Sequence, residues 1–352
     1  MSRFLSGGLD ALRAYVPGEQ PRDKSYIKLN TNESPYPPAP QVLEAIGKNA
    51  IADLRLYSDP ECTELRQALA ARYGVSARNV TVGNGSDELL SFCFAAFCER
   101  GTGVSYPDIS YGFYQVFAEL YGLVKAPVPL AEDLSIRPGD YCGRVGAVFI
   151  ANPNAPTGLC LSIEDIEYVV KSNPDKLVVI DEAYIDFGGV SCVPLTARYD
   201  NLLAVQTFSK SRSLAGARLG FAIGNEALIA DLDKLRYSTN PYNVNRLTLL
   251  AGVAALGGQD YYDNNNQRII RLREHTSAQL RKSGFYLTGS KANFIFARTP
   301  KLDGKALYLG LKARGILVRH FEKERIRDFV RITVGTQEQM RTLIDALKEM
   351  LD

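Results

Sequence analysis

Short apolar runs alternate with helical patterns through residues 41–240 of this chain. The runs at 79–82, 145–150, 177–180 and 202–205 have the length and bounding residues of β-strands. The run at 177–180 has no polar alternation, so it is predicted to be a strand buried on both faces. Strands that alternate with helices build a mostly parallel sheet covered on both faces, so the pattern predicts an α/β fold.

The rest of the chain lies on either side of this region. Residues 1–30 are a polar arm with little regular pattern, and the alternation breaks near 240–242. A smaller α+β part follows. We therefore expect an N-terminal arm (1–30), a large domain (31–240) and a small C-terminal domain (241–352).

Two helices have clear end signals. Asp59 is a capping residue, Pro60 follows it in the first turn, and Gly74 stands at the exit. The last helix is expected to open with the capping box that Thr336 and Gln339 form.

A lysine stands just beyond the apolar run at 202–205. Thr207 and Ser209 crowd Lys210, and Arg218 follows eight positions later. A lysine at a strand end becomes a Schiff-base nucleophile when desolvation and neighbouring cations lower its pKa. Hydroxyl groups and an arginine are suited to hold a phosphate. The set suggests pyridoxal 5′-phosphate (PLP) bound to Lys210. The plain alternative is a surface lysine in a serine-rich loop.

An aspartate follows directly after the run at 177–180. Asp181 is therefore expected at the C-terminal end of a strand, where open α/β sheets bind their ligands. A carboxylate there keeps the pyridine nitrogen of PLP protonated, and the protonated ring accepts electrons. Tyr184 lies three residues on, within reach of the ring's phenolic oxygen. The alternative is that Asp181 caps the next element.

Two turns after strands add polar groups. Gly85 and Ser86 belong to a glycine-rich turn that leads into a helix, whose free N–H groups attract anions. The turn lacks the third glycine of a dinucleotide site and the Gly-Lys-Ser/Thr of a Walker loop, and a plain helix cap is equally compatible with it. Asn and Pro residues at 152–158 predict a rigid turn, where an asparagine amide can donate to the cofactor ring.

Taken together, these motifs resemble the fold-type I PLP-dependent aminotransferases. The matching stretches are 85–87, 110–114, 152–158, 181–184 and 209–218. More narrowly, stretches at 15–18, 29–35, 240–245 and 330–336 are similar to those of the histidinol-phosphate aminotransferases, a class II family. The resemblance covers nearly the whole chain. It implies a large domain with a mostly parallel seven-stranded sheet between helices, plus a smaller α+β domain.

The resemblance also implies a role for each matching residue. Lys210 forms the Schiff base, Asp181 pairs with the pyridine nitrogen, Tyr184 contacts the ring oxygen, and Tyr111 stacks on the ring. The remaining cofactor-binding residues, most of them around the phosphate, are Gly85, Ser86, Asp87, Thr207, Ser209 and Arg218.

Four further residues take their expected roles from the same resemblance. Arg331 is similar to the arginine that grips a substrate α-carboxylate, and Arg319 and Tyr15 to residues that contact a substrate phosphate. Tyr57 resembles a tyrosine that reaches the cofactor phosphate of the partner subunit. The resemblance therefore implies a homodimer with shared active sites.

The chain departs from the commoner family pattern at one position. Ala155 stands directly before Pro-Thr-Gly, where an asparagine is usual. Asn154 is adjacent and is expected to bind the cofactor in its place, although neighbouring residues of an extended segment point in opposite directions.

Composition agrees with a soluble cytoplasmic enzyme. The chain has 352 residues, and its 41 basic and 39 acidic residues leave a net charge of only +2, which argues against nucleic acid or a membrane surface as the main partner. Six dispersed cysteines and two histidines give no support for a metal site or disulfide framework. The sequence shows no leader and no long apolar run, so we expect neither secretion nor membrane spanning.

The expected activity is transfer of an amino group between histidinol phosphate and 2-oxoglutarate, giving imidazole acetol phosphate and glutamate in histidine biosynthesis, as the resemblance implies. A threonine-phosphate decarboxylase and an aromatic amino-acid aminotransferase of the same fold stay open. A PLP-binding regulatory module without catalysis is disfavoured, because an arm of about 30 residues is too short for a DNA-binding domain. The missing third glycine disfavours a nicotinamide dehydrogenase.

Overall fold

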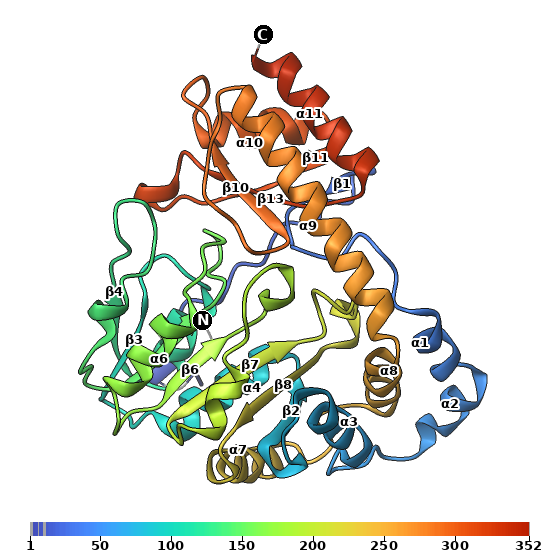
Figure 1. The fold of residues 1–352 in the computed structure, drawn as a ribbon, viewed down its shortest axis with the longest axis vertical. Coiled ribbons are helices and arrows are strands. Elements are labelled where there is room, and N and C mark those ends of the chain that lie inside the picture. Colours follow the sequence, from blue (N-terminus) through green and yellow to red (C-terminus); the bar gives the residue numbers. More distant parts are fainter. Residues whose placement is uncertain (1–2, 6, 10–11, 352) are drawn as a thin grey trace.

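The computed structural model describes residues 3–5, 7–9 and 12–351, and a seven-stranded sheet forms its centre (Figure 1). The strand order is β2-β8-β7-β6-β5-β3-β4, and only β8 runs antiparallel to its neighbours. The mostly parallel sheet expected from the sequence is thus confirmed. Its strands are β2 (Val80–Asn84), β3 (Gly103–Pro107), β4 (Val124–Val128), β5 (Ala147–Ala151), β6 (Val178–Asp181), β7 (Leu202–Thr207) and β8 (Leu219–Gly224).

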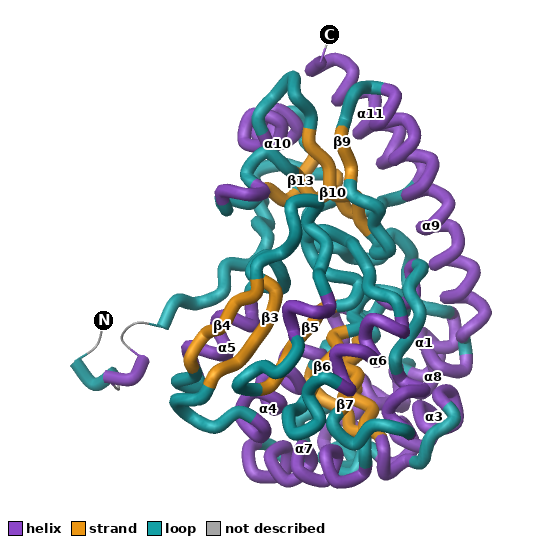
Figure 2. The backbone as a smooth tube through the Cα atoms, turned by 60° about the vertical axis from the view of Figure 1, so that its left-hand side comes forward, coloured by secondary structure: helices purple, strands orange, loops and turns teal. Residues whose placement is uncertain are grey.

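Helices cover both faces of this sheet (Figure 2). Because side chains alternate along a strand, Val178 and Ile180 of β6 enter one apolar cluster and Val179 enters the other. The first cluster includes residues of α3 (Thr63–Tyr73), α6 (Ile163–Lys171) and α8 (Arg246–Gly257), and the second includes residues of α4 (Ser86–Phe97), α5 (Phe113–Leu120) and α7 (Glu226–Thr239).

A smaller α+β part lies above the large sheet in Figure 1. Its antiparallel sheet has the order β12-β13-β10-β9, and α10, α11 and α9 pack in its core. The elements are α9 (Gln259–Lys282), β9 (Tyr286–Leu287), β10 (Phe294–Arg298), α10 (Gly304–Ala313), β12 (Arg319–His320), β13 (Val330–Thr333) and α11 (Gln337–Leu351).

The chain passes between the two parts more than once. Strand β1 (Ile27–Lys28) pairs in parallel with β11 (Ile316–Leu317) of the smaller part, and Leu29 is buried in the same core. The chain then descends to α1 (Pro40–Ala45) and α2 (Lys48–Ala52) beside the large sheet. It returns upward through the continuous helix α9 (Figure 1).

A polar contact also joins the two parts through Arg325, which lies between β12 and β13 in the chain. The Arg325 guanidinium donates to the carbonyl oxygens of Leu130 and Ala131 at 2.9 and 2.7 Å. It also lies 3.3 Å from the carboxylate of Asp108. Ile326 packs beside them in an apolar cluster that spans both parts.

The two helix-end predictions have different outcomes. Helix α3 begins at Thr63 rather than at Pro60, because Cys62 takes a left-handed conformation with φ 51° that interrupts the turn. Asp59 still accepts hydrogen bonds from the backbone N–H groups of Glu61 and Thr63, and Gly74 ends the helix with φ 67°. At α11 the expected capping box between Thr336 and Gln339 is present.

A membrane-spanning helix and a metal cluster are both absent from the described residues. None of the helices there is long and apolar enough to cross a membrane. In the same part of the chain, no cluster of three or more histidine, cysteine or acidic side chains has the arrangement of a metal site.

Candidate active site

A cavity of about 350 Å³ opens where β6 and β7 end. The carboxyl ends of parallel strands are where open α/β sheets bind ligands. The lining brings together segments that are far apart in the sequence. It consists of Thr31, Glu33, Ser86, Asp87, Tyr111, Ala151, Ala155, Asp181, Ala183, Tyr184, Thr207, Ser209, Lys210, Ala215, Gly216 and Arg218.

Asp181 provides a buried carboxylate in this cavity. It is the last residue of β6 and is only 5% exposed. Its Oδ2 accepts a hydrogen bond from the Tyr114 hydroxyl at 2.9 Å, and its Oδ1 accepts one from the Ala183 N–H at 3.1 Å. Burial raises the pKa of Asp181 to about 6, against these two hydrogen bonds and the charge of Lys210, which lower it. A cationic group placed beside this carboxylate would restore its ionised form.

Lys210 and Tyr184 line the same cavity. The Lys210 Nζ donates to the carbonyl oxygen of Thr31 at 3.3 Å and lies 5.8 Å from the centre of the Tyr184 ring. Since the partner of this ammonium group is a neutral carbonyl, the amine is not tied into an ion pair. It is available to a carbonyl compound in the cavity.

One end of the cavity has the features of an anion site. Ser86 is the first residue of α4, so the unpaired N–H groups of that helix face this end. Gly85 has φ +81°, and a Cβ added there would lie 2.6 Å from the Arg218 guanidinium. The Thr207 and Ser209 hydroxyl oxygens lie 3.0 Å apart after β7. Hydroxyls, helix N–H groups and a guanidinium therefore converge.

Asp87 connects two of the expected cofactor residues. Its Oδ1 accepts a hydrogen bond from the Tyr111 hydroxyl at 2.5 Å, and its Oδ2 pairs with Arg218 at 3.0 Å. Arg218 itself has φ 54°, an uncommon conformation for a residue with a side chain, and such strain occurs often at binding sites. Asp87 thus holds both the aromatic wall and the arginine in place.

Two arginines stand directly opposite one another in the small sheet. Arg319 of β12 and Arg331 of β13 are register partners, an arrangement that repulsion makes unfavourable. In the described part of the chain, both donate to backbone carbonyls: Arg319 to those of Val16 and Pro17, and Arg331 to that of Asn30. The Arg331 Nε is buried without a partner, and desolvation lowers the Arg331 pKa. Neither arginine forms an ion pair with a carboxylate among the described residues, so the pair favours an anionic ligand.

Tyr15 lies near these arginines, although it does not line the cavity. Its ring stacks on Phe113 at 4.2 Å and lies 6.2 Å from the Tyr111 ring. Desolvation raises the pKa of the Tyr15 hydroxyl, and the charges of Arg319 and Arg331 act against this rise. The arm thereby places a phenol between the aromatic wall and the two arginines.

Asn154 does not face the cavity, contrary to the expectation that it binds the cofactor ring. Its Nδ2 donates to the Ile109 carbonyl at 2.9 Å and to Thr157 Oγ1 at 3.2 Å, and its Oδ1 accepts from Ser110 at 2.6 Å. Both amide ends are engaged in holding the loop together. Ala155 is the neighbour that lines the cavity.

Tyr57 lies outside the cavity lining, as do Tyr15, Asn154, Arg319 and Arg331. Its side chain is 77% exposed and stacks on Tyr242 at 4.4 Å, outside the cavity lining. A role in the site of its own subunit has no support in this geometry.

Three residues near the site received no role from the sequence. Thr31 lines the cavity, Asn32 donates to the Tyr184 hydroxyl, and Tyr114 donates to Asp181. The sequence feature that could have pointed to Thr31 and Asn32 is the cluster of Asn and Thr residues at 30–32, which directly follows the buried residue Leu29. Polar side chains in such a position need partners, which marks them as members of a network.

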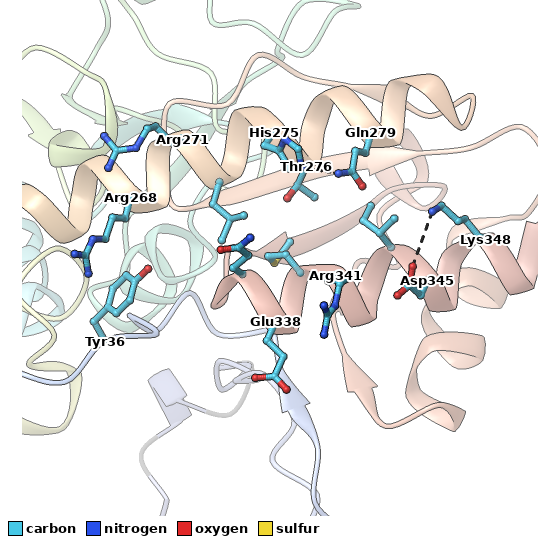
Figure 3. A pocket seen from close by; sticks show the side chains of 14 residues that line it. Tyr36, Arg268, Arg271, His275, Thr276, Gln279, Glu338, Arg341, Asp345 and Lys348 are labelled. Carbon is cyan, nitrogen blue, oxygen red and sulfur yellow. Dashed lines mark hydrogen bonds and ion pairs between the residues drawn. The ribbon is translucent and has the colours of Figure 1, made fainter.

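A larger groove of about 990 Å³ lies elsewhere, between α9 and α11 (Figure 3). Its rim carries solvent-exposed charged side chains such as Arg271, Glu338 and Arg341. The Asp345–Lys348 pair at 3.9 Å is the ion pair drawn there. None of the expected site residues lines this groove, so its size alone does not make it the active site.

The chain is similar to known proteins over nearly its whole length. The model of the family "Aminotransferase class I and II" matches residues 24–347. A histidinol-phosphate aminotransferase of Brachyspira hyodysenteriae is 47% identical over 100% of this chain and 99% of its own length. Histidinol-phosphate aminotransferase 1 of Bordetella parapertussis is 50% identical over 99% of each. The solved histidinol-phosphate aminotransferase of Sinorhizobium meliloti, in complex with pyridoxal 5′-phosphate, superposes with a TM-score of 0.91 at 27% identity, covering 100% of this chain and 98% of the other.

Proposed function

This chain belongs to the class I and II aminotransferases, specifically to the histidinol-phosphate aminotransferases, and on that premise we propose how its site works. The proposed reaction transfers an amino group reversibly between histidinol phosphate and 2-oxoglutarate, giving imidazole acetol phosphate and glutamate in histidine biosynthesis. The proposed cofactor is PLP. A cytoplasmic location stays a prediction.

The residues around the cavity fit PLP. A carboxylate that burial makes costly to ionise, Asp181, is suited to face a pyridinium nitrogen. Ser86, Ser209 and Arg218 converge at the end where a phosphate dianion would be neutralised. Tyr111 supplies an aromatic wall between them. These groups match the three chemically distinct regions of the cofactor.

When bound, PLP supplies an electron-accepting ring conjugated to the substrate α-carbon. Lys210 supplies the amine that holds the cofactor aldehyde. The Lys210 Nζ would also serve as general base and acid for the proton at the substrate α-carbon. Asp181 keeps the pyridine nitrogen protonated through both half-reactions, and Tyr111 and Arg218 hold the ring and its phosphate.

The observation that carries the substrate proposal is the opposed pair Arg319 and Arg331. The two guanidinium groups come from directly paired residues and have no carboxylate partner among the described residues. They are therefore suited to a substrate with anionic groups. We assign Arg331 to the carboxylate of glutamate and Arg319, with Tyr15, to the phosphate of histidinol phosphate. In the other half-reaction Arg331 serves a different group of histidinol phosphate.

One experiment separates this proposal from its rivals. The PLP form is mixed in turn with histidinol phosphate, phenylalanine and threonine phosphate, and conversion of the bound cofactor to its amine form is followed by absorbance. Rapid conversion with histidinol phosphate alone is expected. A faster conversion with phenylalanine favours an aromatic aminotransferase, and release of carbon dioxide from threonine phosphate favours a decarboxylase.

The variant Arg319→Ala is expected to bind histidinol phosphate less well. Loss of a charge-assisted hydrogen bond typically costs ~1.5–3 kcal/mol, so the Michaelis constant should rise roughly ten- to a hundredfold. The glutamate half-reaction should change much less, because glutamate carries no phosphate. Steady-state kinetics with each substrate in turn measure both effects.

The control for this variant is Arg314→Ala, which removes an arginine from the same part of the molecule, where it pairs with Glu349. Arg319 also holds the arm through the Val16 and Pro17 carbonyls. An equal loss in both half-reactions would therefore mean that its role is to hold the arm rather than to select a phosphate.

We further propose that two chains share their active sites in a homodimer. The segment 43–57 exposes large apolar side chains, and its last residue is Tyr57. Exposed apolar side chains gathered in one segment are typical of an interface. The large exposed side chains of this segment are Leu43, Ile51, Leu54, Leu56 and Tyr57.

Mixing two inactive or impaired subunits tests this sharing. Lys210→Ala subunits are combined with Tyr57→Phe subunits, and heterodimers are isolated by two different affinity tags. If sites are shared, one site of each heterodimer regains both residues, and its specific activity should rise above that of both parent homodimers. Verified heterodimers that show no such gain would count against a contribution of Tyr57 to the partner's site.

A further inference from the structure

Asn32 has an unusual backbone and a fully engaged side chain. Its φ is 57°, in the left-handed region, and it is 1% exposed. Such a conformation persists only where the surroundings impose it. The Asn32 backbone N–H donates to Thr333 Oγ1 at 3.0 Å, and its carbonyl accepts from Asn293 Nδ2 at 3.0 Å. Strand β13 and the segment before β10 therefore lock this residue in place.

Thr333 decides which way the Asn32 amide points. The Thr333 hydroxyl oxygen already accepts the Asn32 backbone N–H, and its single proton goes to Asn32 Oδ1 at 3.0 Å. With Oδ1 on that side, Nδ2 must face the other way. It donates to the Tyr184 hydroxyl oxygen at 2.9 Å. With this orientation both ends of the Asn32 amide and the Thr333 hydroxyl have hydrogen-bond partners.

The consequence concerns the proton of Tyr184. Because the Tyr184 oxygen accepts a hydrogen bond from Asn32, its own O–H is left to donate elsewhere. The ring stands edge-on to Phe294 at 5.3 Å and packs in the cluster that contains Ala155. Tyr184 lines the cavity, whereas the Asn154 amide is engaged by its own loop. The O–H of Tyr184 is thus left to donate to a group in the cavity.

We propose that Asn32 is a positioning residue that makes Tyr184 the hydrogen-bond donor to the phenolic oxygen of the cofactor. The inference rests on PLP being the cofactor, as proposed above. A donated proton stabilises negative charge on that oxygen. It therefore lowers the pH at which the bound cofactor loses its ring-system proton, a change that is visible in its absorption spectrum.

The variant Asn32→Asp tests the direction of this hydrogen bond. Aspartate keeps the shape and tolerates the left-handed backbone, but its carboxylate accepts instead of donating. The Tyr184 proton should then turn toward Asp at position 32, away from the cofactor. The midpoint of the cofactor's spectral titration should rise by about one to two pH units. The titration uses bound cofactor in the absence of substrate.

A double-mutant cycle with Tyr184→Phe separates this effect from the added charge. In the Tyr184→Phe background, Asn32→Asp retains only its through-space charge effect. The rise in the titration midpoint should therefore fall to half or less of its value in the parent background. Equal shifts in both backgrounds would overturn the proposal. Asn32→Gly, which keeps the left-handed backbone without charge, should give a smaller rise that disappears in the Phe background. This second variant decides the question if the aspartate variant does not fold.

The outcome for the parent protein keeps this test distinct from that of the proposed function. A parent that binds no PLP, measured by equilibrium dialysis, contradicts the proposed function and this inference with it. A parent that binds PLP and titrates normally, with equal Asn32→Asp shifts in both backgrounds, contradicts the role of Asn32 alone.

Discussion

The variant Lys210→Ala is expected to lose amino transfer by at least about a thousandfold, since both the covalent attachment and the proton-transferring amine are removed. Lys210 lines the cavity just beyond the end of β7, and among the described residues its Nζ donates a hydrogen bond only to the neutral carbonyl of Thr31. The measurement is the single-turnover rate of each half-reaction. Both rates should fall together, because the same amine serves both directions.

A lysine elsewhere provides the control. Lys291→Ala changes an exposed side chain and should leave the rate near the parental value. Reduction of the PLP form with borohydride, followed by peptide mapping, should place the pyridoxyl adduct on Lys210. An adduct on another lysine, or a Lys210→Ala protein with parental rates, would remove Lys210 from its assigned role.

The variant Asp181→Asn should slow the chemical step far more than it weakens substrate binding. The amide cannot keep the pyridine nitrogen protonated, so the electron-accepting ring loses most of its effect. A loss of about 3 kcal/mol corresponds to roughly a hundredfold in rate. Pre-steady-state kinetics should show this drop in the rate constant at saturating substrate, with a much smaller change in apparent affinity.

Graded variants sharpen this test. Tyr114→Phe keeps the carboxylate but removes the hydroxyl that donates to it at 2.9 Å, so a smaller loss in the same step is expected. Tyr106→Phe is the matched control, because that ring lies 6.1 Å from Tyr114 and its hydroxyl makes no hydrogen bond to the described residues. An Asp181→Asn protein that retains PLP and turns over at the parental rate would exclude the assigned role.

The sequence was sufficient for features that depend on local pattern. An apolar run followed by Asp181 predicted a strand end, and β6 ends at that residue. Helix α11 begins with the expected capping box because both partners lie within one turn. The mostly parallel sheet was predicted from the alternation of strands and helices, because helices that connect parallel strands bury both faces of the sheet.

Features that depend on distant partners could not be predicted in this way. The Asn154 amide turns away from the cavity because its partners, Ile109 and Ser110, lie on another loop more than 40 positions away. The network of Asn32, Thr333 and Tyr184 joins three distant segments for the same reason. Strand β8 runs antiparallel to its neighbours because the chain reverses within residues 208–218, and no local pattern predicted that reversal. The roles of the individual site residues stay predictions.

The Arg325 contact has a consequence for the cavity itself. Besides the passages of the chain, the two parts meet where the Lys291 N–H donates to the Gly158 carbonyl at 2.8 Å and the Arg273 guanidinium donates to the Phe187 carbonyl at 2.9 Å. Relative movement of the parts must break contacts of this kind. Because Asp108, which Arg325 contacts, precedes the loop that carries Tyr111, loss of the Arg325 contact would loosen the aromatic wall of the cavity as well as the contact between the parts.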